Sequence, residues 1–317
     1  MKKNTSLLLV CSLLTLLAFK RANVETNPLW HEQKIKNYLP HMTSPEVADL
    51  LKKTDMVIIP IPALEQHGRH LPIGTDFLNG VERAKLVAQR TDVLVAPVLM
   101  IGQSPYHMGF PGTITLSSVT VVQVYFEAVQ SLLQHGFKRF LILNSHGGNR
   151  AISTFLVDRI NQETAGIAVE LGEAAAPFRK RNTSTEPATA SKEKVFDRHG
   201  GVGETSSSLY LIPNLVQMDK AETAKLTLPK HMQEMVPQVL DGDATANLVF
   251  LAEGLKAKET GKKTSAAEMS STGVWGIGDL KTSSAEKGRE DTERFVDAAV
   301  QFIEKWKKLR PVKIHEE

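Results

Sequence analysis

Residues 56–62 read MVIIPIP, and the chain continues from 63 to 76 as ALEQHGRHLPIGTD. The first segment is a short continuous apolar run, which is typical of a buried strand in a parallel sheet. The second places Glu65, His67 and Asp76 just beyond that strand, with glycine and proline between them. Functional sites of open α/β sheets form beyond the carboxyl ends of the strands. The stretch therefore predicts an α/β fold with a parallel sheet and the first group of residues of a functional site.

Other apolar runs along the chain alternate with amphipathic segments. We expect strands at 93–98, 139–144 and 166–171, and helices at about 76–90, from 118 to Gly136, up to about Ile160, and at about 286–309. This alternation predicts βαβ units and a mainly parallel sheet in an α/β fold. We place a single domain at about 35–310 and expect the polar stretches 179–194 and 256–268 to be exposed loops.

Composition excludes several classes of protein. The chain has 317 residues, of which 42% are hydrophobic and 23% charged, so it can build a large core and is not globally disordered. Its formal charge of +3 includes four basic residues and no acid within 1–22, so the remainder carries −1. No basic stripe interleaved with aromatic residues is present, and nucleic acid is not an expected partner.

The N-terminus has the pattern of a targeting segment. Two lysines precede an apolar run from Leu7 to Phe19, which has the length of a signal-peptide core and is short for a membrane span. We expect residues 1–22 to be a signal peptide, or alternatively an uncleaved N-terminal anchor, and the protein to be periplasmic or secreted. Cys11 is the only cysteine. A processed chain would therefore contain neither a disulfide nor a thiolate metal site.

Two more polar clusters accompany the first one. His146 follows the expected strand 139–144 and precedes a glycine pair, whereas His199 and Glu204 lie in DRHGGVGETS, just before an expected helix. Nitrogen and oxygen ligands without thiolate suit Zn²⁺, Mn²⁺ or Fe²⁺. Three carboxylates and several histidines exceed the needs of one tetrahedral zinc, so we expect two divalent ions with one bridging carboxylate, an arrangement suited to hydrolysis.

Other catalytic motifs are missing from the sequence. It contains no Walker-type phosphate loop, no G-x-G-x-x-G after a strand and no G-x-S-x-G.

Five segments together resemble the creatininase family of metal-dependent creatinine amidohydrolases and their relatives. They are ALEQHGRHLPIGTD, SPYHMGFPGTITL, NSHGGN, HGGVGETS and TGVWGIGDLKTSSAEKGR, and the resemblance covers about residues 55–305. It implies a single three-layer α/β/α domain with helices on both faces of the sheet, commonly assembled as a hexamer. It also implies two-metal hydrolysis of a C–N bond in a cyclic or linear amide.

The resemblance assigns roles to individual residues. The implied metal ligands are Glu65, His67, Asp76, His146 and, as a replacement ligand, Glu204. Asp76 is the implied bridge, and His199 matches the histidine that moves protons to or from the substrate nitrogen, as an imidazole near neutral pKa can. His70 is interpreted as a structural residue. The expected substrate contacts are Tyr106, His107, Ser145, Gly147, Gly148 and Asn149.

One departure from the family pattern bears on the substrate. Creatininases have a tyrosine and a metal-binding glutamate after the second-motif histidine, where this chain has Gly147 and Gly148. Such a glycine pair is typical of relatives that act on other amides. We therefore expect a creatinine amidohydrolase-like enzyme that attacks a small-molecule amide through a metal-bound hydroxide. The alternatives are a formamide deformylase or peptide-processing hydrolase of the same fold, and a non-catalytic metal- or ligand-binding periplasmic protein.

Overall fold

The computed structural model describes residues 27, 29, 32–179, 197–224, 226–228, 230–241, 243–255, 265–276 and 278–311. The residues from Ile35 onward form one compact unit. The expected leader at 1–22 and nearly all of the polar stretch 179–194 lie outside the described residues. None of the helices in the described part is both long enough and apolar enough to span a membrane.

A four-stranded parallel sheet with the order β2-β1-β3-β4 forms the centre of this unit. The strands are β1 (Met56–Ile61), β2 (Leu94–Val95), β3 (Arg139–Asn144) and β4 (Ile167–Glu170). Every residue of β1 is buried, as its continuous apolar run predicts. β2 is much shorter than the expected 93–98, because Pro97 has no N–H to continue the ladder.

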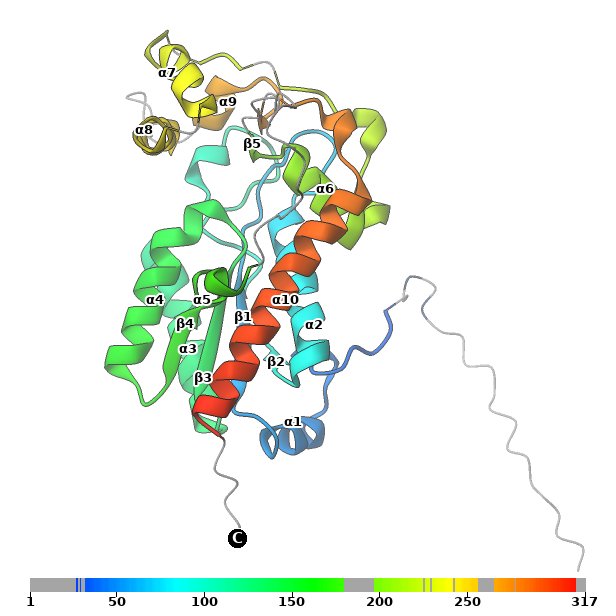
Figure 1. Ribbon diagram of the computed structural model, residues 1–317, viewed down its shortest axis with the longest axis vertical. Helices are drawn as coiled ribbons and strands as arrows, with labels where there is room; N and C mark the ends of the chain where they lie inside the picture. Colours follow the sequence, from blue (N-terminus) through cyan, green and yellow to red (C-terminus); the bar gives the residue numbers. More distant parts are fainter. Residues whose placement is uncertain are drawn as a thin grey trace, which may run out of the picture. The chain divides into compact units, whose positions relative to one another are not determined.

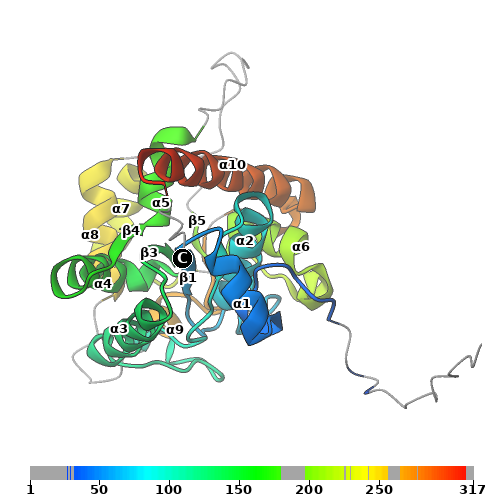
Figure 2. The same cartoon turned by 90° about the horizontal axis from the view of Figure 1, so that it is seen from below.

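Helices cover both faces of the sheet (Figures 1 and 2). Helices α1 (Ser44–Leu51), α3 (Ser118–Gln134) and α4 (Arg150–Glu163) pack on one face, and α2 (Thr75–Thr91), α5 (Leu171–Ala175) and α10 (Ala285–Leu309) pack on the other. Side chains of β1 alternate between the two cores, with Ile59 on the first and Ile58 on the second. The predicted three-layer α/β architecture is thus confirmed.

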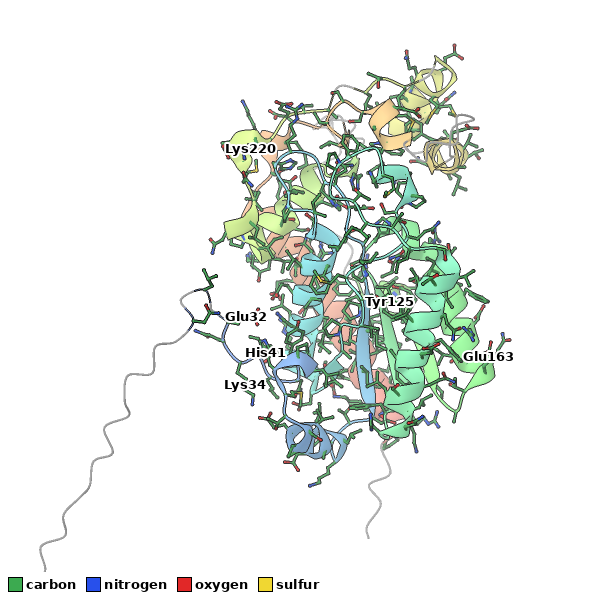
Figure 3. The ribbon with its side chains drawn as sticks, turned by 180° about the vertical axis from the view of Figure 1, so that it is seen from behind. Glu32, Lys34, His41, Tyr125, Glu163 and Lys220 are labelled. Atoms are coloured by element: carbon green, nitrogen blue, oxygen red, sulfur yellow. The ribbon has the colours of Figure 1, made fainter. Side chains whose placement is uncertain are left out.

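Helix α3 shows how local sequence and packing cooperate. The Ser117 side chain caps it by accepting a hydrogen bond from the Thr120 N–H at 3.2 Å. Tyr125 is fully buried against the sheet, and its hydroxyl donates to the Pro60 carbonyl at 3.1 Å (Figure 3). Val119, which helical spacing alone would place with the core residues, is 80% exposed in the first turn.

Beyond the sheet lies a third apolar core, built mainly from α7 (Lys230–Leu240), α8 (Ala244–Leu255) and α9 (Ser265–Met269). Helix α9 corrects the expectation of a loop through 268, because Ala266 is fully buried in this core. Strand β5 (Asp197–His199) pairs antiparallel with β6 (Trp275–Gly276), and α6 (Val202–Leu211) follows and packs closely on α10. This β5–α6 connection carries the third polar cluster.

Candidate metal centre

The first corner of the site leaves the sheet at the carboxyl end of β1. The segment folds back on itself, since the Glu65 N–H donates to the Ile73 carbonyl at 3.1 Å, and Gly68 adopts a φ of +75° at the turn. Glu65 and His67 are fully buried, and Asp76 lies buried in the first turn of α2. Free N–H groups and the helix dipole favour a carboxylate at that position.

The other corners come from the adjacent strand β3 and from the β5–α6 connection. His146 follows β3, and its N–H donates to the Asn144 Oδ1 at 3.1 Å. Because Ile61 of β1 lies opposite Asn144 of β3, both strand ends deliver their side chains to one place. His199 ends β5, and Glu204 lies in the first turn of α6. His199 is buried, whereas the Glu204 side chain is 39% exposed.

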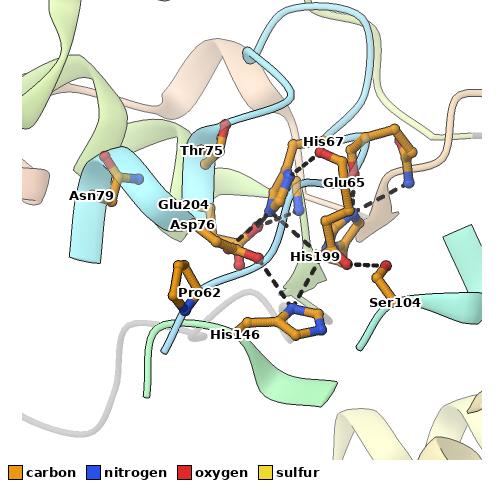
Figure 4. Close-up of polar contacts among 12 residues, drawn as sticks. Pro62, Glu65, His67, Thr75, Asp76, Asn79, Ser104, His146, His199 and Glu204 are labelled. Carbon is orange, nitrogen blue, oxygen red and sulfur yellow. Dashed lines mark hydrogen bonds and ion pairs between the residues drawn. The ribbon is translucent and has the colours of Figure 1, made fainter. Parts of the chain in front are cut away.

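Asp76 faces two of the histidines of this cluster (Figure 4). Its Oδ1 is 3.2 Å from the His67 Nε2, and its Oδ2 is 3.0 Å from the His146 Nδ1. The Glu65 Oε1 lies 3.2 Å from the same His146 nitrogen, and the Glu204 Oε2 lies 3.7 Å from His67 Nε2. This arrangement could hold two ions, one beside Glu65 and His146 and the other beside His67 and Glu204, with the Asp76 carboxylate between the two half-sites.

These side chains fit divalent cations by their unsatisfied atoms. The Glu65 Oε1, His67 Nε2 and Asp76 Oδ2 are buried and have no hydrogen-bond partner within the described residues. Potential ligand atoms of Glu65, His67 and Asp76 all lie within 4.8 Å of one another, and so do those of His67, His199 and Glu204. A buried polar atom without a partner is costly, so a bound cation would satisfy several of them at once.

Electrostatics within the cluster agree with this fit. Burial disfavours a charge on His67, but Asp76 and Glu204 outweigh it and raise its pKa to about 10. Burial likewise opposes ionisation of Glu65, yet His146 and His107 hold the pKa of this carboxyl well below its usual range. The Glu65 and Asp76 carboxyls are thus ionised, and protons on imidazoles balance their charge. Bound divalent ions would supply the same positive charge in place of these protons.

Two neighbours of the cluster, Ser104 and Gln66, were not among the residues expected from the sequence, whereas His107 was. The Ser104 hydroxyl donates to the Glu65 Oε2. The Gln66 side-chain nitrogen lies 2.8 Å from the His107 Nδ1 and donates to the Gly273 carbonyl at 3.0 Å. His107 stacks on His199 with ring centroids 4.1 Å apart. The signal available for Ser104 was its position three residues before His107, in a loop rich in glycine and proline.

His70 belongs to the same loop but contacts a different neighbour. Its Nε2 lies 2.8 Å from the Thr205 hydroxyl on α6. Burial and the nearby His67 lower its pKa to about 4, so it is neutral. This geometry is consistent with the structural role expected for it.

The candidate metal centre forms part of the wall of a cavity of about 860 Å³. Four of the six expected substrate contacts also line this cavity, namely Tyr106, His107, Gly147 and Gly148. Phe155 and Trp275 add aromatic surface, and Arg150, Asp158 and Arg198 add charge. The arrangement combines a polar ligand cluster with a roomy, partly apolar compartment, as small-molecule sites usually do.

The remaining two expected substrate contacts, Ser145 and Asn149, do not line the cavity, so the prediction is corrected for them. Asn149 is fully buried, and its amide donates to the Pro62 carbonyl at 2.8 Å while its Oδ1 accepts from the Gln103 N–H at 3.0 Å. It braces two site loops and is closed off from the cavity. Ser145 packs against α2, where a Cβ on Gly80 would lie 2.4 Å from its hydroxyl, and it is not part of the cavity lining.

Fold and site together define an α/β protein with a buried histidine–carboxylate cluster at the carboxyl edge of a parallel sheet. The family model described as creatininase, creatinine amidohydrolase, matches residues 40–303. The chain therefore belongs to the creatininase family, and it is a creatininase-family hydrolase.

Individual relatives differ in activity and in coverage. The creatinine amidohydrolase of Pseudomonas putida is 31% identical over 178 residues, which are 52% of this chain and 67% of that protein. The mycofactocin precursor peptide peptidase of Mycolicibacterium smegmatis is 26% identical over 257 residues, covering 79% and 85%. The 3-dehydro-scyllo-inosose hydrolase of Thermotoga maritima is 32% identical over 111 residues, so the match spans only 36% of its length.

Solved structures agree on the fold. A crystal structure of creatinine amidohydrolase superposes with a TM-score of 0.60 at 21% identity, covering 88% of this chain and 99% of that one. Similar structures include creatininases described as manganese and zinc–zinc forms and a variant complexed with creatine.

Proposed function

We propose that this chain is a metal-dependent amidohydrolase that cleaves a C–N amide bond in a cyclic or linear amide other than creatinine. The observation that carries the proposal is the Asp76 carboxylate, which faces His67 with one oxygen and His146 with the other beside a large cavity. A carboxylate shared in this way is the arrangement expected of a bridging ligand.

Five residues would hold the two ions: Glu65, His67, Asp76, His146 and Glu204. Such ions, when bound, polarise an amide carbonyl and lower the pKa of water. The donor set suits Zn²⁺, Mn²⁺ or Fe²⁺. The protein contributes the geometry: Ser104 holds one oxygen of Glu65, which leaves the other oxygen directed at the centre.

Three observations support a proton-transfer role for His199. Its Nε2 lies 2.6 Å from the Gln66 carbonyl, which can only accept a hydrogen bond, so the ring proton resides on Nε2. Its Nδ1 then carries a lone pair and faces the Glu65 Oε1 at 3.5 Å. Burial and His67 lower the pKa of His199, so its neutral form is available near pH 7. In this role the Nδ1 accepts a proton from water and delivers it to the leaving nitrogen.

The cavity supports a substrate larger than creatinine. A volume of about 860 Å³ lies in the upper part of the range of about 300–1,000 Å³ for sites that bind drug-sized ligands, whereas creatinine is a single small ring. Gly147 and Gly148 add no side chains to this space. The same observation favours the second candidate, a deformylase or peptide-processing hydrolase, and the peptidase relative aligns over more of this chain than the creatininase relative does.

A substrate panel tests the proposal. Zinc- or manganese-loaded protein is assayed against creatinine, N-formyl amides and short peptides. We expect turnover of at least one non-creatinine amide, and a loss of about 100-fold or more in Glu65→Gln and His199→Ala. His135→Ala, which removes an exposed histidine after α3, is the control. Metal-replete protein without any turnover would instead favour the third candidate, a non-catalytic metal- or ligand-binding protein.

We also propose export to the periplasm or cell exterior, supported by the basic-then-apolar pattern of residues 1–22, and a hexameric assembly, supported by the family resemblance. N-terminal sequencing of the protein from cell fractions tests the first proposal and distinguishes a cleaved leader from an anchor. Light scattering after size-exclusion chromatography tests the second.

A further inference from the structure

The Tyr106 hydroxyl lies beside the candidate metal centre, in the space that a side chain at position 148 would need. A Cβ added to Gly148 would lie 1.8 Å from the Tyr106 hydroxyl oxygen and 2.5 Å from the His146 Nε2. The tyrosine hydroxyl therefore fills the place into which a side chain at 148 would start to extend. Both residues line the cavity, so this hydroxyl lies at the cavity wall.

The position of the Tyr106 ring is fixed by packing. Tyr106 lies in a short 3-10 helix, Pro105–His107, and is only 8% exposed. Its ring contacts His107 edge to face, with centroids 4.9 Å apart. The hydroxyl oxygen is 2.9 Å from the His146 Nε2. A polar group held this firmly next to a reaction centre needs no reorganisation to act.

The protonation of His146 determines whether it can accept a hydrogen bond from the Tyr106 hydroxyl. The Nδ1 of His146 faces Asp76 and Glu65 at 3.0 and 3.2 Å, so a cation held by these carboxylates would bind Nδ1 and leave the ring proton on Nε2. This N–H can donate to the Gln103 carbonyl at 3.1 Å or to the Tyr106 oxygen at 2.9 Å, but it can accept nothing. The O–H of Tyr106 therefore has no acceptor on His146.

Among the residues that the structure describes, the Tyr106 hydroxyl has a hydrogen bond with His146 and no acceptor elsewhere for its proton. Burial raises the pKa of the Tyr106 hydroxyl above its ordinary value, so the phenol keeps its proton at neutral pH. The hydroxyl thus presents an unused donor to the cavity, a few ångströms from the ligand atoms of the centre.

We propose that Tyr106 is a catalytic residue whose hydroxyl donates a hydrogen bond to the amide oxygen of the substrate as that oxygen becomes a tetrahedral oxyanion. This inference rests on the proposed amidohydrolase function. Water adds to the carbonyl carbon, the C–N bond breaks, and the leaving nitrogen takes its proton from His199, giving a carboxylic acid and an amine. Tyr106 keeps its own proton throughout, and its contribution is the hydrogen bond that strengthens as charge develops.

The test compares Tyr106→Phe with Tyr125→Phe, which removes a buried hydroxyl that donates to the Pro60 carbonyl and is not part of the cavity lining. Inorganic phosphate, a tetrahedral oxyanion, is titrated by calorimetry into zinc-loaded wild type and variants whose metal content has been measured. We expect Tyr106→Phe to keep its metal, to bind phosphate at least tenfold more weakly, and to lower kcat about 100-fold with KM within about threefold. Tyr125→Phe should match wild type in all these measurements.

Several outcomes would overturn the inference. If Tyr106→Phe binds phosphate like wild type and keeps its kcat, the hydroxyl is not a donor to the oxyanion. If the variant loses metal while its metal-loaded fraction binds phosphate normally, Tyr106 only positions His146. If wild type binds phosphate more tightly than Tyr106→Phe but hydrolyses no amide, Tyr106 is an oxyanion donor and the amidohydrolase function is refuted. A zinc-loaded wild type that neither binds phosphate nor turns over any amide contradicts both proposals.

Discussion

Replacing Asp76 with asparagine is the sharpest perturbation of the candidate metal centre. The carboxylate is 5% exposed, and its two oxygens face His67 and His146 at 3.2 and 3.0 Å. Asparagine has nearly the same shape but keeps only one acceptor oxygen, and its NH₂ group would point at one of the two half-sites. The substitution therefore removes one bridging oxygen and one negative charge while it leaves the backbone of α2 in place.

The expected magnitude follows from Coulomb's law. At an effective dielectric constant of about 20, two unit charges about 4 Å apart interact by about 4 kcal/mol, so a carboxylate and a divalent ion interact by about 8 kcal/mol. Solvent relaxation and the neighbouring carboxylates compensate part of this loss, and we take about half as the net effect. A loss of about 4 kcal/mol weakens binding by about a thousandfold.

The assay is a competitive zinc titration with a chromogenic chelator, together with the metal stoichiometry after dialysis. Wild type should retain two ions, whereas Asp76→Asn should retain at most one, with the second bound about a thousandfold more weakly. Asp158→Asn removes a similar charge from the exposed part of the cavity wall and should not change the stoichiometry. Retention of two ions by Asp76→Asn, with affinities within tenfold of wild type, would refute the shared-carboxylate geometry.

Three further predictions concern other parts of the protein. Gly148→Ala places a Cβ 2.5 Å from the His146 Nε2 and 1.8 Å from the Tyr106 hydroxyl, so the His146 ring must shift and we expect the metal affinity to fall at least tenfold; an unchanged zinc titration would contradict this packing. Metal affinity should rise with pH toward about 10, because His67 must release the proton that its raised pKa retains, and titrations in two buffers of different ionisation enthalpy should show proton release; binding without proton release would refute it. Gly288→Ala would bring a Cβ within 1.9 Å of the Ser206 carbonyl where α10 packs on α6, and thermal unfolding should show a loss of about 2 kcal/mol or more, since overpacked helix contacts cost that much.

Much of the fold could be predicted from local patterns. A six-residue apolar run such as β1 is buried wherever it occurs, because exposing it to water is unfavourable, and its alternation with amphipathic helices admits few topologies. Polar residues that directly follow such strands must lie at the carboxyl edge of the sheet. This is why Glu65, His67 and His146 could be selected as candidate ligands before their distances were known.

Contacts between distant loops could not be predicted in this way. The shared position of Asp76, the burial of Asn149 between two loops and the contact of the Tyr106 hydroxyl with His146 join segments up to 87 residues apart. Such contacts depend on how β1, β3 and α2 pack against one another, and local hydrophobic periodicity carries no information about that. The candidate ligands could therefore be selected from the amino-acid sequence, whereas the position of Asp76 between His67 and His146 and the contact of the Tyr106 hydroxyl with His146 arise only when packing brings these loops together.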